Sequence, residues 1–117
     1  MYTSIYVHRV PRDRKGILLE ILREAASVYA ELGVSGCQVF EATDLSARYG
    51  CSTFPGSMDV GPGETILVEL NHFRDREHHD RTMEAVNRDE TINALYERFT
   101  KVLDVGRVVR GEFSQVL

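Results

Sequence analysis

Two hydrophobic periodicities alternate along this chain of 117 residues, and their order constrains the fold more than any other feature. Apolar residues recur at every second position, as in a half-buried strand, over residues 3–10, 35–42, 64–73 and 107–116. They recur at spacings of three and four, as along one face of a helix, in the segments after residues 13 and 75. The predicted order is therefore strand, helix, strand, strand, helix, strand, with a break in the second helical segment at residues 87–90.

Single residues predict where the helices and loops lie. Asp13 and Asp75 are predicted helix N-caps, because an aspartate side chain accepts hydrogen bonds from the free N–H groups of a first helical turn. Gly33 and Gly106 are predicted to end helices, since glycine readily adopts the left-handed conformation that follows many helix C-termini. Residues 43–63 hold four glycines and two prolines without a sustained period, which predicts a long loop that is a candidate lid or dimer arm.

This order of elements is the split βαβ arrangement of the ferredoxin-like α+β fold. Its helices cover one face of a four-stranded antiparallel sheet with the spatial order 4-1-3-2, and the other face stays bare. About 100–150 residues is the commonest domain size, so we expect residues 1–117 to form a single domain.

Each predicted strand has a more apolar side, which we assign to the helices. That side comprises Ile5, Val7, Cys37, Val39, Ile66, Val68, Leu70, Val109 and Phe113. The bare side then comprises Tyr6, His8, Val10, Gln38, Phe40, Ala42, Leu67, Glu69, Asn71, Phe73, Val108, Arg110 and Glu112. Its aromatic and aliphatic side chains are too apolar to leave in water, so we expect a second copy of the chain to cover them in a homodimer. Two such sheets packed face to face form a barrel with space for a small organic molecule.

Polar residues of the predicted bare side form a candidate site. His8 on the first strand is expected beside Glu69 or Asn71 of the third strand, with Arg110 or Glu112 of the fourth strand on its other side. A histidine next to a carboxylate can act as a general base near neutral pH, and Arg110 can orient a carboxylate or an enolate. The alternative is a polar network that only satisfies itself at a dimer interface, for example through a Glu69–Arg110 ion pair. The predicted catalytic residues are His8 and Arg110, and the predicted ligand-binding residues are Tyr6, Gln38, Phe40, Glu69, Asn71 and Glu112.

The sequence predicts no cofactor and no metal. His78 and His79 are consecutive in a predicted helix, so their side chains point about 100° apart and cannot share one ion. A site made of His72, His79 and one carboxylate is the alternative. Cys51 lies in the long loop, where Arg48 is the one candidate for the basic neighbour that an activated thiol needs, so we expect no catalysis by this residue.

The composition limits which classes of partner and which cellular compartments we expect for this protein. The net charge of −4 would repel a phosphate backbone, so we expect no nucleic-acid partner. The longest apolar run is only a few residues, so we expect no membrane contact. The first residues lack the basic and apolar segments of a signal peptide, and two cysteines are too few for a disulfide framework. We therefore expect a cytoplasmic protein with reduced thiols.

Several motifs also resemble a known family. They are Phe54-Pro55, Pro62-Gly63-Glu64-Thr65, Arg76, His78-His79-Asp80, Asp89 and the closing segment Arg107-Val108-Val109-Arg110-Gly111-Glu112-Phe113. On these residues the chain resembles the dimeric α/β-barrel superfamily, and within it the small bacterial domain-of-unknown-function family fourteen-twenty-eight. The resemblance covers nearly the whole chain and implies the fold and a homodimer, but no activity. Ser4-Ile5 and Glu69-Leu70 depart from the residues common in that family, so the chemistry of the pocket can differ.

Three functions are consistent with the sequence. The first is a homodimer that binds a small organic molecule in a pocket beside the sheet. The second is a cofactor-independent monooxygenase or isomerase, in which His8 removes a proton while Arg110 or Asn71 stabilises the developing oxyanion. The third is a purely structural or protein-binding dimer with a sealed interface.

Overall fold

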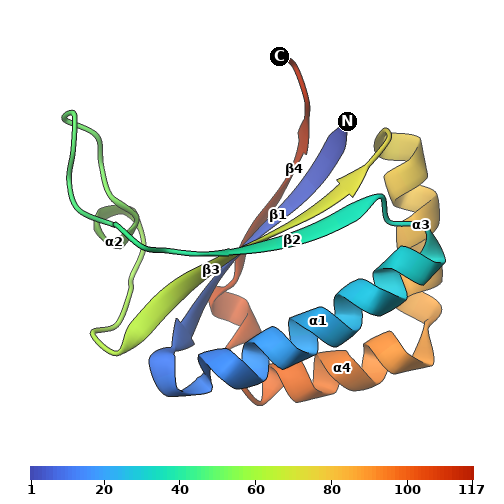
Figure 1. Ribbon diagram of the computed structural model, residues 1–117, viewed down its shortest axis with the longest axis horizontal. Coiled ribbons are helices and arrows are strands. Elements are labelled where there is room, and N and C mark those ends of the chain that lie inside the picture. The colour runs from blue at the N-terminus through green and yellow to red at the C-terminus, as the bar shows by residue number, and fades with distance from the viewer.

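The computed structural model describes residues 1–117. It shows a four-stranded antiparallel sheet with three helices on one face (Figure 1). The strands are β1 (Tyr2–Pro11), β2 (Gly36–Glu41), β3 (Glu64–Phe73) and β4 (Val109–Ser114). The helices are α1 (Lys15–Leu32), α2 (Phe54–Ser57), α3 (Arg76–Arg88) and α4 (Glu90–Thr100), with short 3-10 turns η1 (Arg12–Arg14) and η2 (Val105–Arg107). The sheet order β2-β3-β1-β4 confirms the predicted ferredoxin-like α+β topology.

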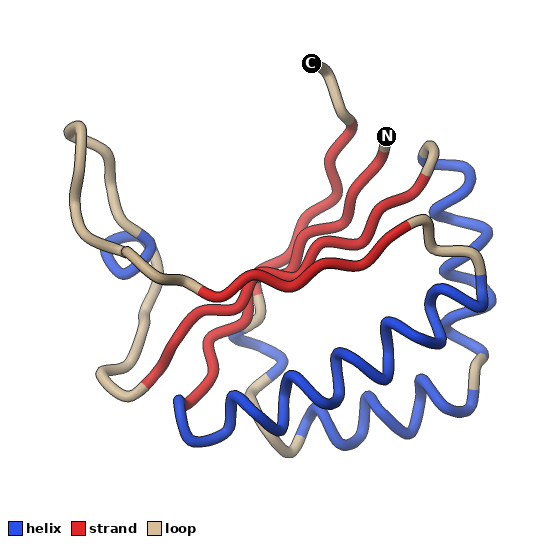
Figure 2. Tube along the Cα trace, in the orientation of Figure 1, coloured by secondary structure: helices blue, strands red, loops and turns tan.

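β1 lies at the centre of the sheet. It pairs with β3 from Tyr2–Phe73 to Pro11–Glu64 and with β4 from Tyr2–Ser114 to Val7–Val109. Figure 2 shows α1, α3 and α4 together on one side of the sheet, while no helix covers the other side. No helix has both the length and the apolar character needed to cross a membrane.

The main core lies between the sheet and helices α1 and α4. Its fully buried sheet residues are Val10 of β1 and Leu67 of β3, and the apolar stripe of α1 contributes Leu18 and Ile21. This stripe follows the predicted spacing of three and four residues, which brings one helix face onto the sheet.

Most predicted helix boundaries are confirmed by their capping groups. Gly33 follows α1 with φ = 109°, in the left-handed region that favours glycine. Asp75 caps α3, because its Oδ1 accepts a hydrogen bond from the His78 backbone N–H at 2.8 Å. The predicted break falls at Asp89, which also caps α4. Asp13 was expected to be an N-cap, but it lies inside η1, and α1 begins at Lys15 without a side-chain cap.

The structure reverses the predicted sheet faces in β1, β3 and β4. Val10 and Leu67, which we had assigned to the bare side, are buried against the helices. In β2 the assignment was correct, since Cys37 and Val39 face α1. The uncovered face is made of Thr3, Ile5, Val7, Arg9, Gly36, Gln38, Phe40, Ile66, Val68, Leu70, His72, Val109, Gly111 and Phe113. We call it the bare face, and it is the more apolar of the two because the polar side chains lie under the helices.

The predicted long loop between β2 and β3 is confirmed, and it extends away from the sheet (Figure 1). Its return to β3 is held by Arg107, which donates two hydrogen bonds to the Glu64 carboxylate at 2.6 and 2.9 Å. This bidentate pairing lowers the pKa of Glu64 to about 2. Arg9 and Arg107 also donate to the backbone carbonyl of Asp59, so the base of the loop is fixed to the end of the sheet.

Candidate functional site

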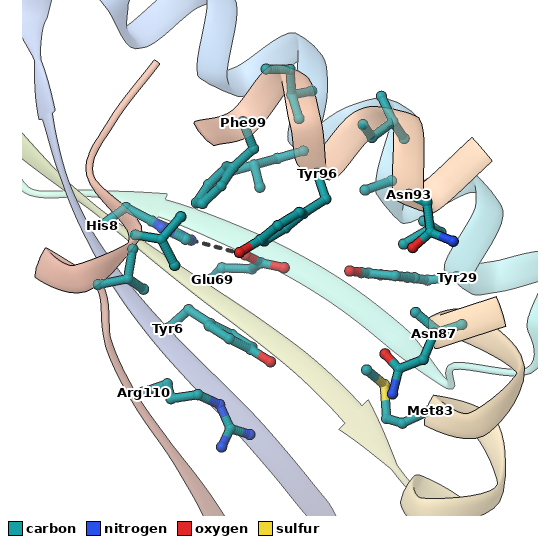
Figure 3. A pocket seen from close by; sticks show the side chains of 18 residues that line it. Tyr6, His8, Tyr29, Glu69, Met83, Asn87, Asn93, Tyr96, Phe99 and Arg110 are labelled. Atoms are coloured by element: carbon teal, nitrogen blue, oxygen red, sulfur yellow. Dashed lines mark hydrogen bonds and ion pairs between the residues drawn. The ribbon is translucent and has the colours of Figure 1, made fainter. Parts of the chain in front are cut away.

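A cavity of about 370 Å³ lies between the sheet and helices α1, α3 and α4 (Figure 3). Thirteen of its eighteen lining residues are hydrophobic. The polar exceptions include His8 from β1, Glu69 from β3 and Arg110 from β4. Tyr96 of α4 is about half exposed at the cavity wall, so the cavity meets solvent on this side. An apolar cavity with a few convergent polar groups is typical of a small-molecule site.

A buried hydrogen-bonded row of three side chains crosses the floor of this cavity. His8 Nε2 lies 2.9 Å from Glu69 Oε1, and Asn71 Nδ2 donates to Glu69 Oε2 at 3.0 Å. Because a carboxylate only accepts hydrogen bonds, the proton of this contact is carried by Nε2 of His8. His8 is 2% exposed and Glu69 is 8% exposed, so the pair is shielded from bulk water.

Two polar atoms of this row have no hydrogen-bond partner. They are His8 Nδ1 and Asn71 Oδ1, and both are buried. Buried polar atoms without partners are rare, and an ordered water or a ligand group is one way to satisfy them.

Aromatic side chains form much of the cavity wall. Tyr96 and Phe99 of α4 have nearly parallel rings whose centres are 6.4 Å apart. Phe99 also makes an edge-on contact with the His8 ring of the sheet, with the two ring centres 5.5 Å apart. Tyr6 lies beside His8 with its ring almost parallel at 6.2 Å. Burial raises the pKa of the Tyr29 hydroxyl, and the nearby Glu69 carboxylate raises it further. Tyr29 therefore stays protonated at neutral pH.

Arg110 lines the cavity and is linked through Glu112 to Tyr2 at the start of β1. Its guanidinium lies 5.3 Å from the centre of the Tyr6 ring and donates to Glu112 Oε2 at 2.7 Å. The other oxygen of Glu112 accepts a hydrogen bond from the Tyr2 hydroxyl at 2.7 Å. Hydrogen bonds from Arg110 and Tyr2 hold the pKa of Glu112 below its ordinary value. Glu112 therefore balances the charge of Arg110.

Glu112 also belongs to the only group of side chains arranged like metal ligands. This group consists of His79, Asp80 and Glu112, whose ligand atoms lie within 4.8 Å of one another. Glu112 already accepts from two donors, and His79 Nδ1 lies 2.8 Å from Asp80 Oδ1. Between α3 and β4 the closest of these atoms are His79 Nδ1 and Glu112 Oε1, at 3.8 Å, so each of the three side chains is already paired with protein groups. The alternative metal site with His72 is wrong, because His72 lies on the bare face and bonds to Thr3 and Gln38.

A second, smaller cavity of about 240 Å³ lies between α1 and β2 and also reaches Glu69 and Asn71. Cys37 lines it, and burial together with the Glu69 charge raises the pKa of this thiol to about 11. Cys37 is therefore a neutral thiol at physiological pH and a poor nucleophile.

Over residues 1–101 the sequence matches a family described as a protein of unknown function, DUF1428. The chain belongs to this family. The curated proteins include no match to it.

Three solved structures share the fold of this DUF1428 protein at low sequence identity. An uncharacterized NIPSNAP domain protein from Burkholderia xenovorans is 14% identical with a TM-score of 0.63, and the match covers 99% of this chain and 95% of that one. A protein from Arabidopsis thaliana is 8% identical with a TM-score of 0.66, covering 100% and 97% of the two chains. An antibiotic biosynthesis monooxygenase is 14% identical with a TM-score of 0.62, and both chains are covered completely. At such identities the likeness establishes the fold alone.

In the DUF1428 protein four of the eight predicted site residues line the main cavity: Tyr6, His8, Glu69 and Arg110. Asn71 lies behind Glu69, and Glu112 lies outside the cavity on the far side of Arg110. Gln38 and Phe40 are on the bare face, so they do not share a pocket with the other six. β2 has the phase we assumed, whereas β1, β3 and β4 have the opposite phase, so the other six predicted residues lie on the helix side.

The sequence did not indicate the helix residues that complete the cavity. Tyr29, Tyr96 and Asn87 point into it from α1, α4 and α3 (Figure 3). Tyrosines on an apolar helical stripe look like ordinary core residues. For the partly buried Tyr29, the available signal was that a buried hydroxyl needs a hydrogen-bond partner.

Proposed function

We propose that this protein binds a small, largely apolar organic molecule in the cavity between the sheet and the helices. The observation that supports it is the buried His8–Glu69 pair on the floor of a mostly hydrophobic cavity of about 370 Å³. A buried carboxylate in such surroundings is costly unless it is paired, and a ligand with a complementary polar group would complete its hydrogen bonding.

We also propose that the protein is a homodimer joined through the bare face. In one chain this face exposes several large apolar side chains, with Phe40 at 51%, Val109 at 49% and Phe113 at 55% exposure. Arg9 is the only Arg, Lys, Asp or Glu of this face, and its guanidinium donates to the backbone carbonyls of Asp59 and Arg107, so a second copy related by a two-fold axis can pack against the apolar part of the face. In this arrangement the ligand cavities lie outside the dimer interface, one in each chain.

A second candidate is a cofactor-independent enzyme, for example a monooxygenase or an isomerase. The His8–Glu69 pair favours it, since such a pair can take a proton from a bound molecule. Nδ1 of His8 is buried, whereas the Glu69 side chain is 11% exposed, so Glu69 is the member of the pair that a ligand would meet. A structural dimer without a ligand is the remaining possibility, and the experiment below distinguishes it.

The test is a fluorescence titration with 2-naphthol, an aromatic probe of two rings. We expect saturable binding that Ala25→Phe weakens at least tenfold, because Ala25 lines the cavity and a larger side chain there would fill it. Ala30→Phe is the matched control, since Ala30 lies exposed on the same helix. Absence of saturable binding, or equal binding by both variants, would contradict the proposal.

We place the protein in the cytoplasm, where a reducing environment would preserve the free thiols of Cys37 and Cys51. Fractionation of cells that express the tagged protein would test this location.

A further inference from the structure

We infer that the natural ligand is a planar molecule that presents an uncharged hydroxyl group to Glu69, and that anionic ligands are rejected. The inference rests on the proposed cavity function and specifies the class of molecule that the cavity takes. Four features of the cavity support it: the spare acceptor capacity of Glu69, the charge balance, the apolar wall and the surrounding rings.

Glu69 retains acceptor capacity toward the cavity. Each of its two oxygens accepts one hydrogen bond from the protein, from His8 Nε2 at 2.9 Å and from Asn71 Nδ2 at 3.0 Å. A carboxylate has about four lone-pair sites, so about two stay free. In Figure 3 the Glu69 carboxylate lies on the cavity floor among the side chains of Tyr6, Tyr29 and Tyr96. A ligand therefore reaches an acceptor that His8 and Asn71 hold in position.

The charges around the cavity disfavour an anion. Glu69 and Arg110 are the only lining residues with a formal charge when histidine is neutral. The positive charge of Arg110 is already balanced by Glu112, at 2.7 Å. An anionic ligand would therefore face Glu69 without an unpaired cation to compensate it, in surroundings where water screens little.

The apolar wall favours a neutral donor over a protonated amine. An ammonium group would also satisfy Glu69, but it would have to lose its hydration among thirteen hydrophobic lining residues. A hydroxyl loses less hydration on entering the cavity and still forms a hydrogen bond with a charged acceptor.

Aromatic rings on two sides favour a planar molecule. Tyr96 and Phe99 lie on the α4 side, while Tyr6 and His8 lie on the sheet side. Ring systems pack well against such side chains, with edge and face contacts.

The experiment compares three probes with the same two-ring framework: 2-naphthol, 2-methoxynaphthalene and naphthalene-2-carboxylate. We expect the wild-type protein to bind 2-naphthol about tenfold to a hundredfold more tightly than 2-methoxynaphthalene, because only the naphthol donates a hydrogen bond to a charged acceptor. The carboxylate probe should bind most weakly. In Glu69→Gln the preference for naphthol over its methyl ether should fall at least fivefold, and Glu41→Gln, which removes an exposed carboxylate outside the cavity, should keep it.

Equal binding of naphthol and its methyl ether, or tightest binding of the carboxylate, would overturn this inference while the cavity function stands. Binding of none of the three would overturn both. The comparison on the wild-type protein needs no variant, so the test holds even if Glu69→Gln fails to fold.

Discussion

Replacing His8 with phenylalanine tests whether the His8–Glu69 pair has the buried, hydrogen-bonded geometry on which the site depends. Phenylalanine fills nearly the same space and can keep the edge-on contact with Phe99, so the substitution leaves little cavity. It removes the donor at 2.9 Å from Glu69 Oε1, while Asn71 still donates to the other oxygen. The effect therefore isolates one hydrogen bond to a buried carboxylate.

The magnitude follows from burial and charge. A hydrogen bond to a charged group contributes about 1.5–3 kcal/mol, and breaking a buried pair on one side costs about 3–5 kcal/mol. Because Glu69 keeps one of its two donors, we expect His8→Phe to lower the free energy of unfolding by about 3 kcal/mol. The double variant His8→Phe/Glu69→Leu should lose less than His8→Phe alone, since it no longer buries an unpaired carboxylate.

The assay is urea unfolding followed by circular dichroism for the wild type, both single variants and the double variant. All are measured at one protein concentration, because the stability of a dimer depends on concentration. We expect a coupling free energy of about 2 kcal/mol between the two positions. If His8→Phe stays within about 0.5 kcal/mol of the wild type and the two changes add independently, the reasoning about this pair is refuted.

Two further predictions concern the bare face and the loop anchor. Phe40→Glu would place an unpaired charge in the proposed interface, so we expect the dimer dissociation constant in analytical ultracentrifugation to rise at least a hundredfold, and an unchanged dimer would argue against this interface. Glu64 has its pKa lowered from 4.5 to about 2 by hydrogen bonds from Arg107, so the native state gains stability above pH 4.5 and loses it as the pH falls toward 2. Glu64→Gln should therefore be about 1–3 kcal/mol less stable than the wild type at pH 6, with a gap that shrinks below pH 4.5, and a gap independent of pH would count against the bidentate pair.

Local sequence signals were sufficient for most of the fold. The periods of two and of three to four residues identified the strands and helices, and Gly33 and Asp75 marked helix ends that the structure confirms. Helix α1 begins two residues after Asp13 because η1 continues the turn from β1, and no local signal separates these conformations. The last strand is shorter than predicted, since η2 occupies residues 105–107.

The orientation of the sheet could not be read from hydrophobicity. We assumed that the more apolar side of each strand packs on the helices, but Val7 and Val68 lie on the bare face while His8 and Glu69 lie under the helices. Both sides of β1 and β3 carry apolar residues, so the alternation gives the period without its direction. The polar residues His8 and Glu69 lie on the helix side of the strands, where they line the cavity. We had placed them at the dimer interface.

The adjacency of His8 and Glu69 could be predicted from the topology, because the order 4-1-3-2 makes their strands neighbours. The residues that surround the pair could not be predicted, since the positions of Tyr29 and Tyr96 depend on how α1 and α4 pack together over the sheet. A single sequence gives the period of a helix but not the path of its axis across a sheet.

A crystal structure of the protein with 2-naphthol tests the central claim most directly. We expect the probe between the sheet and the helices, with its hydroxyl oxygen at about 2.7 Å from a Glu69 carboxylate oxygen and its rings beside Tyr6 and Tyr96. Density for the probe on the bare face, or in the cavity with its hydroxyl turned away from Glu69, would contradict the account.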